Sequence, residues 1–283
     1  MHSTETGSTD PSASGPPPAS LAGGTPIDVA VLRRIGYRFG VTGWPIVLDM
    51  LPTDTDIDAT MTADIDEQIV RGGLLDREGE PQWWLATALR VLSYPDRELE
   101  IRSFTESGVG RALLARRGHE HVFAVRTDGH VTVRPVDIST TDDIGAIVRR
   151  HCGELGREPI AFTTIAHPTV ELADRLSRCH GAAAAASALH ALGMPGPDAA
   201  VVARAFAETC SRTEIVAIAR DAGVFTQAAG ALGIFDSDRG RIVVSPSRSP
   251  DGRVWTTLSS GSGHRIAQTV GLLVETLPEG WWS

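Results

Sequence analysis

The chain of 283 residues and 30.1 kDa is long enough for one large domain or for two fused halves with a sizeable core. Its hydrophobic content of 42% and charged content of 22% are those of an ordinary globular protein, and no stretch is long and apolar enough to span a membrane. The net charge of −9 argues against general binding to nucleic acids, and three cysteines are too few for a disulfide framework, so we expect a cytoplasmic protein without membrane insertion.

The first 26 residues are rich in serine, threonine, proline and glycine and contain almost nothing that a core could bury. They lack the basic start and the apolar stretch of a secretory signal. We therefore predict a disordered leader over residues 1–26 and a single domain over residues 27–283. The order of its elements divides this domain into a first half of about 27–155 and a second half of about 156–283.

Helical patterns dominate the start of the domain. The segment 27–40 has apolar residues near helical spacing, although its valine and isoleucine residues also allow a strand. The segment 59–71 is acidic and helical, and Gly72-Gly73 ends it as a C-cap would. The segment 82–92 is predicted to be an amphipathic helix that stops before Pro95.

A run of strand patterns follows. The segment 98–105 has the alternation of a half-buried antiparallel strand, and 111–117 is a candidate second strand. Asp128-Gly129 predicts a hairpin between two further strands. A helix with acids in its first turn is then predicted over 142–152.

The second half repeats this arrangement. It opens with three predicted helices, at 168–180, 181–192 and 198–210. A strand over 213–219 follows, and then a hairpin over 241–258 that turns at Asp251-Gly252. The last helix is predicted over 264–276, with its apolar residues on one face.

The same strand, hairpin and helix pattern therefore occurs twice, at low sequence identity. Regular alternation of strands and helices is missing, which disfavours a parallel sheet. The fold class that we expect is α+β. Two repeated β-hairpin-helix units would form a pseudo-two-fold, mainly antiparallel central sheet, flanked by two helical bundles.

The pairs His151-Cys152 and Cys179-His180 could suggest a zinc site. Adjacent residues on a helix point about 100° apart, so neither pair can easily chelate one ion. The usual Cys-x₂-Cys and His-x₃-His spacings are missing. His119 and His121 would share one face of a strand, but they make a poor ligand set. We expect no metal and no cofactor.

The glycine-rich loop 259–264 (SSGSGH) precedes the last helix, and such loops can bind anions. A phosphate-binding or small-molecule-binding enzyme is therefore the alternative hypothesis. The loop lacks the lysine of a P-loop and the third glycine of the dinucleotide fingerprint, which favours a simple turn with a helix cap. The chain is accordingly predicted not to be an enzyme, and no catalytic residue is assigned.

Two pairs of tryptophans stand out, Trp83-Trp84 and Trp281-Trp282. In each pair one ring should face a core while its neighbour is partly exposed. An exposed ring of this kind suits either a partner interface or the anchoring of a helix and a tail.

Several motifs carry a resemblance to a known family. The segment 111–118 (RALLARRG), followed by the hairpin around Asp128-Gly129, resembles the EspG family. The second unit resembles it too, with 238–241 (DRGR), the Asp251-Gly252 hairpin and the terminal amphipathic helix.

Upstream, 71–76 (RGGLLD) is similar to the Arg-Gly-Leu-Val-Asp-type segment of the family, with one extra glycine, and the resemblance extends over residues 27–277. EspG proteins are cytosolic chaperones of type VII (ESX) secretion in mycobacteria and related actinobacteria. The arginine-rich, lysine-free composition suits that range of organisms.

The resemblance implies that this chain covers the hydrophobic helical tip of a PE–PPE heterodimer, with one copy of each protein in the complex. Such a role needs an apolar surface with a polar rim and needs no catalytic group. Self-association through the sheet edges is a further hypothesis. The partner-binding residues that we predict lie on the strand 213–219, the hairpin 241–258 and the last helix: Ile215, Ala217, Arg248, Arg253, Trp255, Ile266, Val270 and Leu273.

Overall fold

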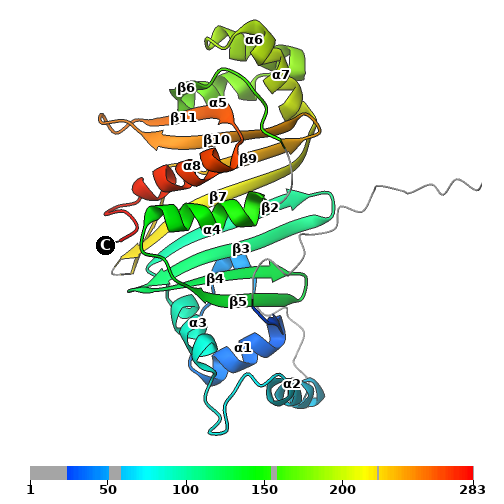
Figure 1. Cartoon of the computed structure of the whole chain (residues 1–283), viewed down its shortest axis with the longest axis vertical. Coiled ribbons are helices and arrows are strands. Elements are labelled where there is room, and N and C mark those ends of the chain that lie inside the picture. The colour runs from blue at the N-terminus through cyan, green and yellow to red at the C-terminus, as the bar shows by residue number, and fades with distance from the viewer. Residues whose placement is uncertain (1–23, 51–58, 154–157, 222, 283) are drawn as a thin grey trace, which may run out of the picture.

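The computed structural model describes residues 24–50, 59–153, 158–221 and 223–282. An eleven-stranded sheet forms the centre of the molecule (Figure 1). Across the sheet, the strands are β1 (Pro26–Asp28), β5 (His130–Val136), β4 (Glu120–Thr127), β3 (Gly108–Arg117), β2 (Arg97–Thr105), β7 (Thr209–Asp221), β9 (Leu232–Ser237), β10 (Gly240–Arg248), β11 (Val254–Ser260) and β6 (Ile165–Pro168). The short strand β8 (Val224–Gln227) pairs with the far end of β7. Every pair of these strands is antiparallel, as predicted.

The helices complete a twofold repeat. The first half has α1 (Val29–Arg38), the single turn η2 (Ile46–Leu48), α2 (Ala59–Arg71), α3 (Trp83–Ser93) and α4 (Thr141–Gly153). The second half has α5 (Thr169–Ser177), α6 (Ala182–Ala191), α7 (Gly196–Ala207) and α8 (Gly263–Glu275). Each half therefore runs through one edge strand, three α-helices, a set of central strands and one long helix. The predicted α+β repeat is confirmed, and it begins earlier in each half than the sequence pattern indicated.

The two edge strands were not predicted as strands of the sheet. β1 and β6 have three and four residues, too few to show an alternation. At the end of the segment predicted as a leader, Pro26 belongs to β1, and a Cβ on Gly24 would lie 2.9 Å from the carbonyl oxygen of Val133. The rest of that leader lies outside the described residues.

The two long helices α4 and α8 lie side by side on one face of the sheet (Figure 1). They cover the largest core, which includes Leu99 and Ile101 of β2 and Ile215 and Ala217 of β7. The two helices approach closely where Gly145 meets Ala267, because a Cβ on Gly145 would lie 2.8 Å from the Ala267 carbonyl oxygen.

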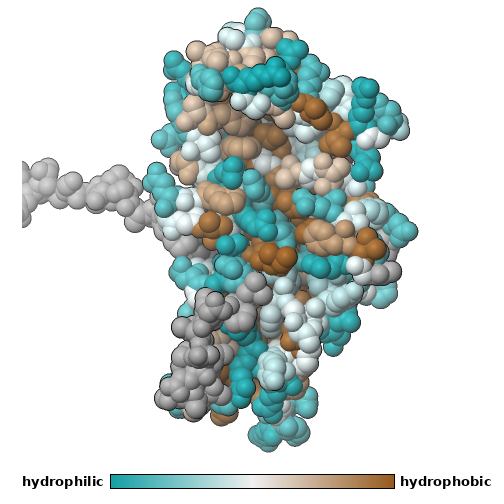
Figure 2. Space-filling view, turned by 180° about the vertical axis from the view of Figure 1, so that it is seen from behind, coloured by the Kyte–Doolittle hydropathy of each residue, from teal (hydrophilic) through white to brown (hydrophobic). Residues whose placement is uncertain are grey.

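The opposite face of the sheet, which we call the open face, is covered only in part. The helices α1 to α3 pack on it at one end and α5 to α7 at the other, each group over a core of its own (Figure 1). Between the two groups, the central strands present their side chains outward. Figure 2 shows hydrophobic and hydrophilic residues mixed over the middle of this face. No helix among the described residues is long and apolar enough to cross a membrane.

Candidate binding surface

The middle of the open face is built from alternate residues of β2 and β7, together with Val109 of β3, which pairs with Phe104. Residues opposite each other in an antiparallel pair lie on the same face. Leu99 and Ile101 face α4 and α8, so Glu100 and Arg102 face the other way, opposite Val216 and Glu214. Phe104 follows on the same side of β2, and its partners in the neighbouring strands are Val109 and Arg212. We call this set the central strip: Arg102, Phe104, Val109, Arg212, Glu214 and Val216.

The central strip combines apolar surface with fixed charges. Val109 is 45% exposed, and the guanidinium of Arg212 lies 4.7 Å from the ring centroid of Phe104. Arg102 contacts buried Glu100 at 2.8 Å, and Arg212 contacts Glu214 at 3.3 Å. The charges are thus paired within the surface, which allows apolar atoms to be exposed between them without a large net charge.

A small cavity of about 240 Å³ adjoins the open face at the end of β7. Trp44, Tyr94 and Arg220 line it, among other residues. Tyr94 is 53% exposed, and Phe225 of β8, 52% exposed, has the guanidinium of Arg220 over its ring at 5.2 Å. The cavity extends the apolar surface towards α3 and the turn η2.

Five of the eight predicted partner-binding residues lie inside the core. Ile215 and Ala217 face α4 and α8 from the sheet, and Ile266, Val270 and Leu273 face the sheet from α8. All five are fully buried, at 0% exposure, so their side chains offer no surface to a partner. We therefore correct that part of the prediction and leave these five out of the surface.

The other three predicted residues lie on the β10–β11 hairpin. Arg248 and Arg253 are exposed, and Trp255 is half-buried. Arg248 pairs with Val254 while Trp255 pairs with Ser247, so Arg248 and Trp255 point to opposite faces of the sheet. The hairpin exists as predicted, but these three side chains do not form one patch.

The central strip was missed at the sequence level for a physical reason. In the strand 213–219 both sets of alternate positions are largely apolar, so the sequence did not show which set faces the core. The only signal lay in β2, where Glu98, Glu100 and Arg102 alternate with Leu99 and Ile101.

The glycine-rich loop has a structural role in this fold. The Ser262 hydroxyl accepts a hydrogen bond of 3.2 Å from the Arg265 amide and caps α8. A Cβ on Gly261 would lie 2.2 Å from Cγ of Arg241, so the backbone packs directly against β10. The turn with a helix cap is therefore the observed arrangement.

The residues considered for metal binding lie apart or in the core. Among the described residues, no three histidine, cysteine or acidic side chains are placed to hold a metal ion. Burial lowers the pKa of His151 to about 4 and raises the pKa of the Cys152 thiol to about 12. The protonated thiol of Cys152 is a core side chain, and the neutral, half-buried imidazole of His151 packs edge-on against Phe123 with ring centroids 5.4 Å apart.

Both tryptophan pairs have the predicted geometry. Trp281 is 2% exposed and Trp282 is 45% exposed. Trp84 packs against the core under α1 to α3, whereas Trp83 is 73% exposed.

The family model of the EspG family matches residues 28–271. The chain belongs to the EspG family. Among its relatives, the ESX-1 secretion-associated protein EspG1 of Mycobacterium tuberculosis is 28% identical over 280 residues, which cover 95% of this chain and 94% of that protein. The ESX-3 secretion-associated protein EspG3 of Mycolicibacterium smegmatis is 28% identical over 250 residues, with 86% and 83% covered. The family predicted from the sequence motifs is thus confirmed.

A solved structure shows the same EspG fold. It is that of the Mycobacterium tuberculosis type VII secretion system chaperone EspG5 in complex with the PE25–PPE41 dimer. The two chains superpose with a TM-score of 0.77 at 18% identity, covering 92% of this chain and 99% of the other. The predicted pseudo-two-fold sheet with flanking helices therefore matches the fold of a known EspG protein.

Proposed function

We propose that this EspG protein is a cytoplasmic chaperone that binds a PE–PPE-type helical pair, one copy of each protein, and keeps it soluble for type VII secretion. The family membership supports the class of function, since the curated relatives are secretion-associated proteins. The single observation that favours this client is the shared fold with an EspG protein that was solved with a PE–PPE dimer.

The central strip and the adjoining cavity are the surface that we assign to the client. A chaperone of an apolar helical tip must expose apolar atoms without aggregating with itself. Val109, Val216 and Phe104 supply such atoms, and the ion pairs of Arg102 and Arg212 keep the strip hydrated when the client is absent. The helices α1 to α3 and α5 to α7 pack on the two ends of this face, so the strip lies between two groups of helices (Figure 1).

The direct test is co-expression of the tagged chain with PE–PPE-type pairs encoded in the same genome. We expect one pair to co-purify as a complex whose mass equals one copy of each of the three proteins, measured by light scattering after gel filtration. A folded chain that retains none of these pairs would overturn the proposal. A complex that contains two copies of the chaperone would instead contradict the stoichiometry alone.

A further inference from the structure

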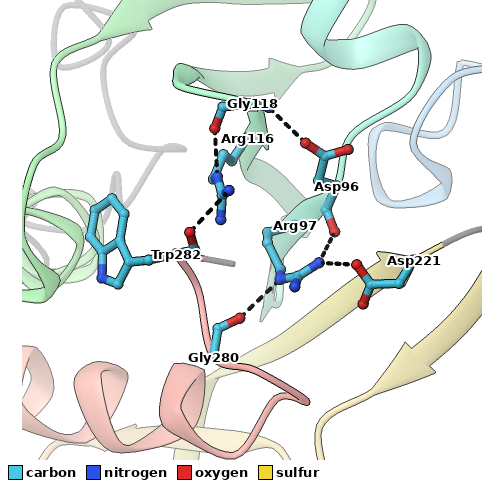
Figure 3. Close-up of polar contacts among 7 residues, drawn as sticks. All are labelled: Asp96, Arg97, Arg116, Gly118, Asp221, Gly280 and Trp282. Atoms are coloured by element: carbon cyan, nitrogen blue, oxygen red, sulfur yellow. Dashed lines mark hydrogen bonds and ion pairs between the residues drawn. The ribbon is translucent and has the colours of Figure 1, made fainter.

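The chain does not stop at the end of α8 but turns back over the sheet (Figure 3). Glu279 and Gly280 both have positive φ, at 58° and 72°, and this turn directs the following residues onto the ends of β2, β3 and β4. Glycine adopts this conformation readily, while Glu279 does so at some cost. The turn is therefore held in place by the contacts of the residues after it.

Trp281 makes the main apolar contact of this tail. Its ring stacks on His121 at the start of β4, with centroids 6.3 Å apart and planes inclined by 15°. The indole Nε1–H donates a hydrogen bond of 3.2 Å to Nε2 of His121. Trp282 packs its ring edge-on against the same imidazole at 5.9 Å.

Two arginines of the first half hold the backbone of the tail (Figure 3). Arg97, fully buried at 0% exposure, donates from Nε to the Gly280 carbonyl at 2.9 Å. Arg116 donates to the Trp282 carbonyl at 3.4 Å. The tail belongs to the second half of the chain, whereas both guanidinium groups belong to the first.

Arg97 also contacts the second half directly. We call the pairing of β2 with β7, where the two halves meet, the seam. The Arg97 guanidinium contacts Asp221 of β7 at 2.9 Å. A second ion pair lies beside the first, with the acid and the base exchanged between the strands. In this pair Glu98 of β2 accepts a hydrogen bond of 2.7 Å from Arg220 of β7. Adjacent strand residues point to opposite faces, so one pair lies under the tail and the other lies on the open face beside the cavity.

The segment that follows α4 is the counterpart of this tail. After α4, the residues 158–160 lie against the start of β10, where the Arg241 amide donates to the Glu158 carbonyl at 2.8 Å and the Ile160 amide donates to the Arg241 carbonyl at 3.2 Å. The segment after α4 thus lies on β10 of the second half, and the segment after α8 lies on the strands of the first half. The first of these segments is bound through backbone hydrogen bonds, while the tail is bound through side chains.

We propose that residues 278–282 form a releasable latch that fastens the second half of the fold to the first and controls the end of the β2–β7 seam. The Trp281 indole is buried in the core under α4 and α8, but within the described residues the tail shares no β-ladder with the strands that it crosses, whereas β2 and β7 share a ladder from Arg97 to Thr105. A chain end held by side-chain contacts opens at lower free energy than strands joined by a backbone ladder in the core. The latch can therefore open while the sheet stays folded.

Amide hydrogen exchange tests this latch through three hydrogen bonds of Asp96, the residue before β2 at the end of the seam. The Asp96 amide donates to the Arg116 carbonyl, the Arg220 amide donates to the Asp96 carbonyl, and the Gly118 amide donates to the Asp96 carboxylate. In Trp281→Ala we expect these amides to exchange about tenfold faster, while the Ser249 amide in the β10–β11 hairpin is unchanged. A single cooperative thermal transition should remain.

Two further variants control the result. Trp281→Phe keeps a ring on His121 but loses the indole N–H. The exchange rates of the three amides in this variant should therefore fall between those of the wild type and those of Trp281→Ala. Trp282→Ala removes the exposed ring and should leave the seam amides within about twofold of the wild type.

Unchanged exchange at the seam in Trp281→Ala would overturn the proposal, and so would equal acceleration of all amides, because the tail would then be part of the global core. A Trp281→Ala chain that cannot fold while Trp281→Phe folds would overturn it for the same reason. If the proposed function holds, opening the latch should also weaken client binding, since the seam adjoins the client surface. A chain that binds no PE–PPE pair would leave the exchange result standing, so the two failures are distinguishable.

Discussion

The carboxylate of Glu98 accepts a hydrogen bond of 2.7 Å from Nε of Arg220, and this pair joins the two halves of the chain. Glu98 is fully buried, while the side chain of Arg220 is 29% exposed. The second carboxylate oxygen, Oε2, has no hydrogen-bond partner among the described residues. Burial raises the pKa of Glu98, and the bond from Arg220 opposes that rise. The charge on Glu98 therefore depends on its single cation.

This asymmetry predicts unequal effects of removing the two partners. Arg220→Met leaves a buried carboxylate without a cation and should lower the free energy of unfolding by about 3 kcal/mol. Glu98→Gln removes the buried charge and leaves a half-exposed arginine that water can solvate, so its cost should stay within about 1 kcal/mol. Urea unfolding at pH 7.5 measures both.

The pH dependence of the free energy of unfolding tests whether the charge of Glu98 causes the loss of stability in Arg220→Met. In Arg220→Met the pKa of Glu98 rises further, so the carboxylate takes up a proton as the pH falls and the deficit should shrink at pH 5. Equal costs for the two variants at both pH values would contradict this account.

The central strip predicts where charge disrupts client binding. Val216→Asp and Val109→Asp each place an unpaired carboxylate in the assigned surface and should weaken retention of a PE–PPE pair at least about tenfold. Val70→Asp on α2 is the matched control, because Val70 is 79% exposed and lies on a helix outside the strip. Pull-down with equal amounts of folded variants measures the difference. Undiminished binding by both strip variants would remove this surface from the proposal.

The contact between α4 and α8 predicts a steric effect of one methyl group. Gly145→Ala would place a Cβ 2.8 Å from the Ala267 carbonyl oxygen and 3.1 Å from its Cα and Cβ, so the helices must separate. We expect a loss of about 1–3 kcal/mol in thermal or urea unfolding. Gly153→Ala at the end of α4 is the control, since its Cβ would only meet Cγ of Arg149 at 3.9 Å. A Gly145→Ala protein as stable as this control would show that the helices can move apart freely.

Buried His121 and half-buried His151 predict how acid changes the free energy of unfolding. Burial and then the charge of Arg116 lower the pKa of His121 to about 4, and burial lowers the pKa of His151 to about 4. The unfolded chain binds these protons near the ordinary value of 6.5, so the free energy of unfolding should fall as the pH decreases from about 6.5 towards 4.

Replacing either histidine should flatten that slope. In His121→Asn the free energy of unfolding, measured with urea, should change less between pH 7 and pH 5 than in the wild type. This holds whatever the effect of the substitution on stability at pH 7. His264→Asn, at an exposed position on α8, serves as the control. A slope unchanged by His121→Asn would show that His121 does not stay neutral in the fold.

The three cysteines should differ in reactivity. Cys152 is 3% exposed and burial raises its thiol pKa to about 12, whereas Cys210 is exposed. With a disulfide reagent at pH 8, Cys210 should react in the native protein and Cys152 only after unfolding. Rapid native labelling of Cys152, located by peptide mass spectrometry, would contradict the core packing under α4.

Local sequence signals predicted the elements whose own residues specify them. The Asp-Gly turns fixed both hairpins, and the 3.6-residue periodicity located α4 and α8 within one or two residues. The central strip could not be chosen in the same way. Ile215 and Val216 are neighbours of similar hydrophobicity, and only the helices packed on one side decide that Ile215 is buried and Val216 is not.

By itself, the sequence determined the repeated antiparallel plan and the family, because alternation, turn residues and motifs act over a few residues. The tertiary structure decided which face of β7 is free, how Trp281 reaches His121, and that Glu98 meets Arg220 across the seam. These contacts join residues 122 and 160 positions apart, and their formation depends on how the two halves pack rather than on local preference. The surface assigned to the client is thus a product of packing between the halves.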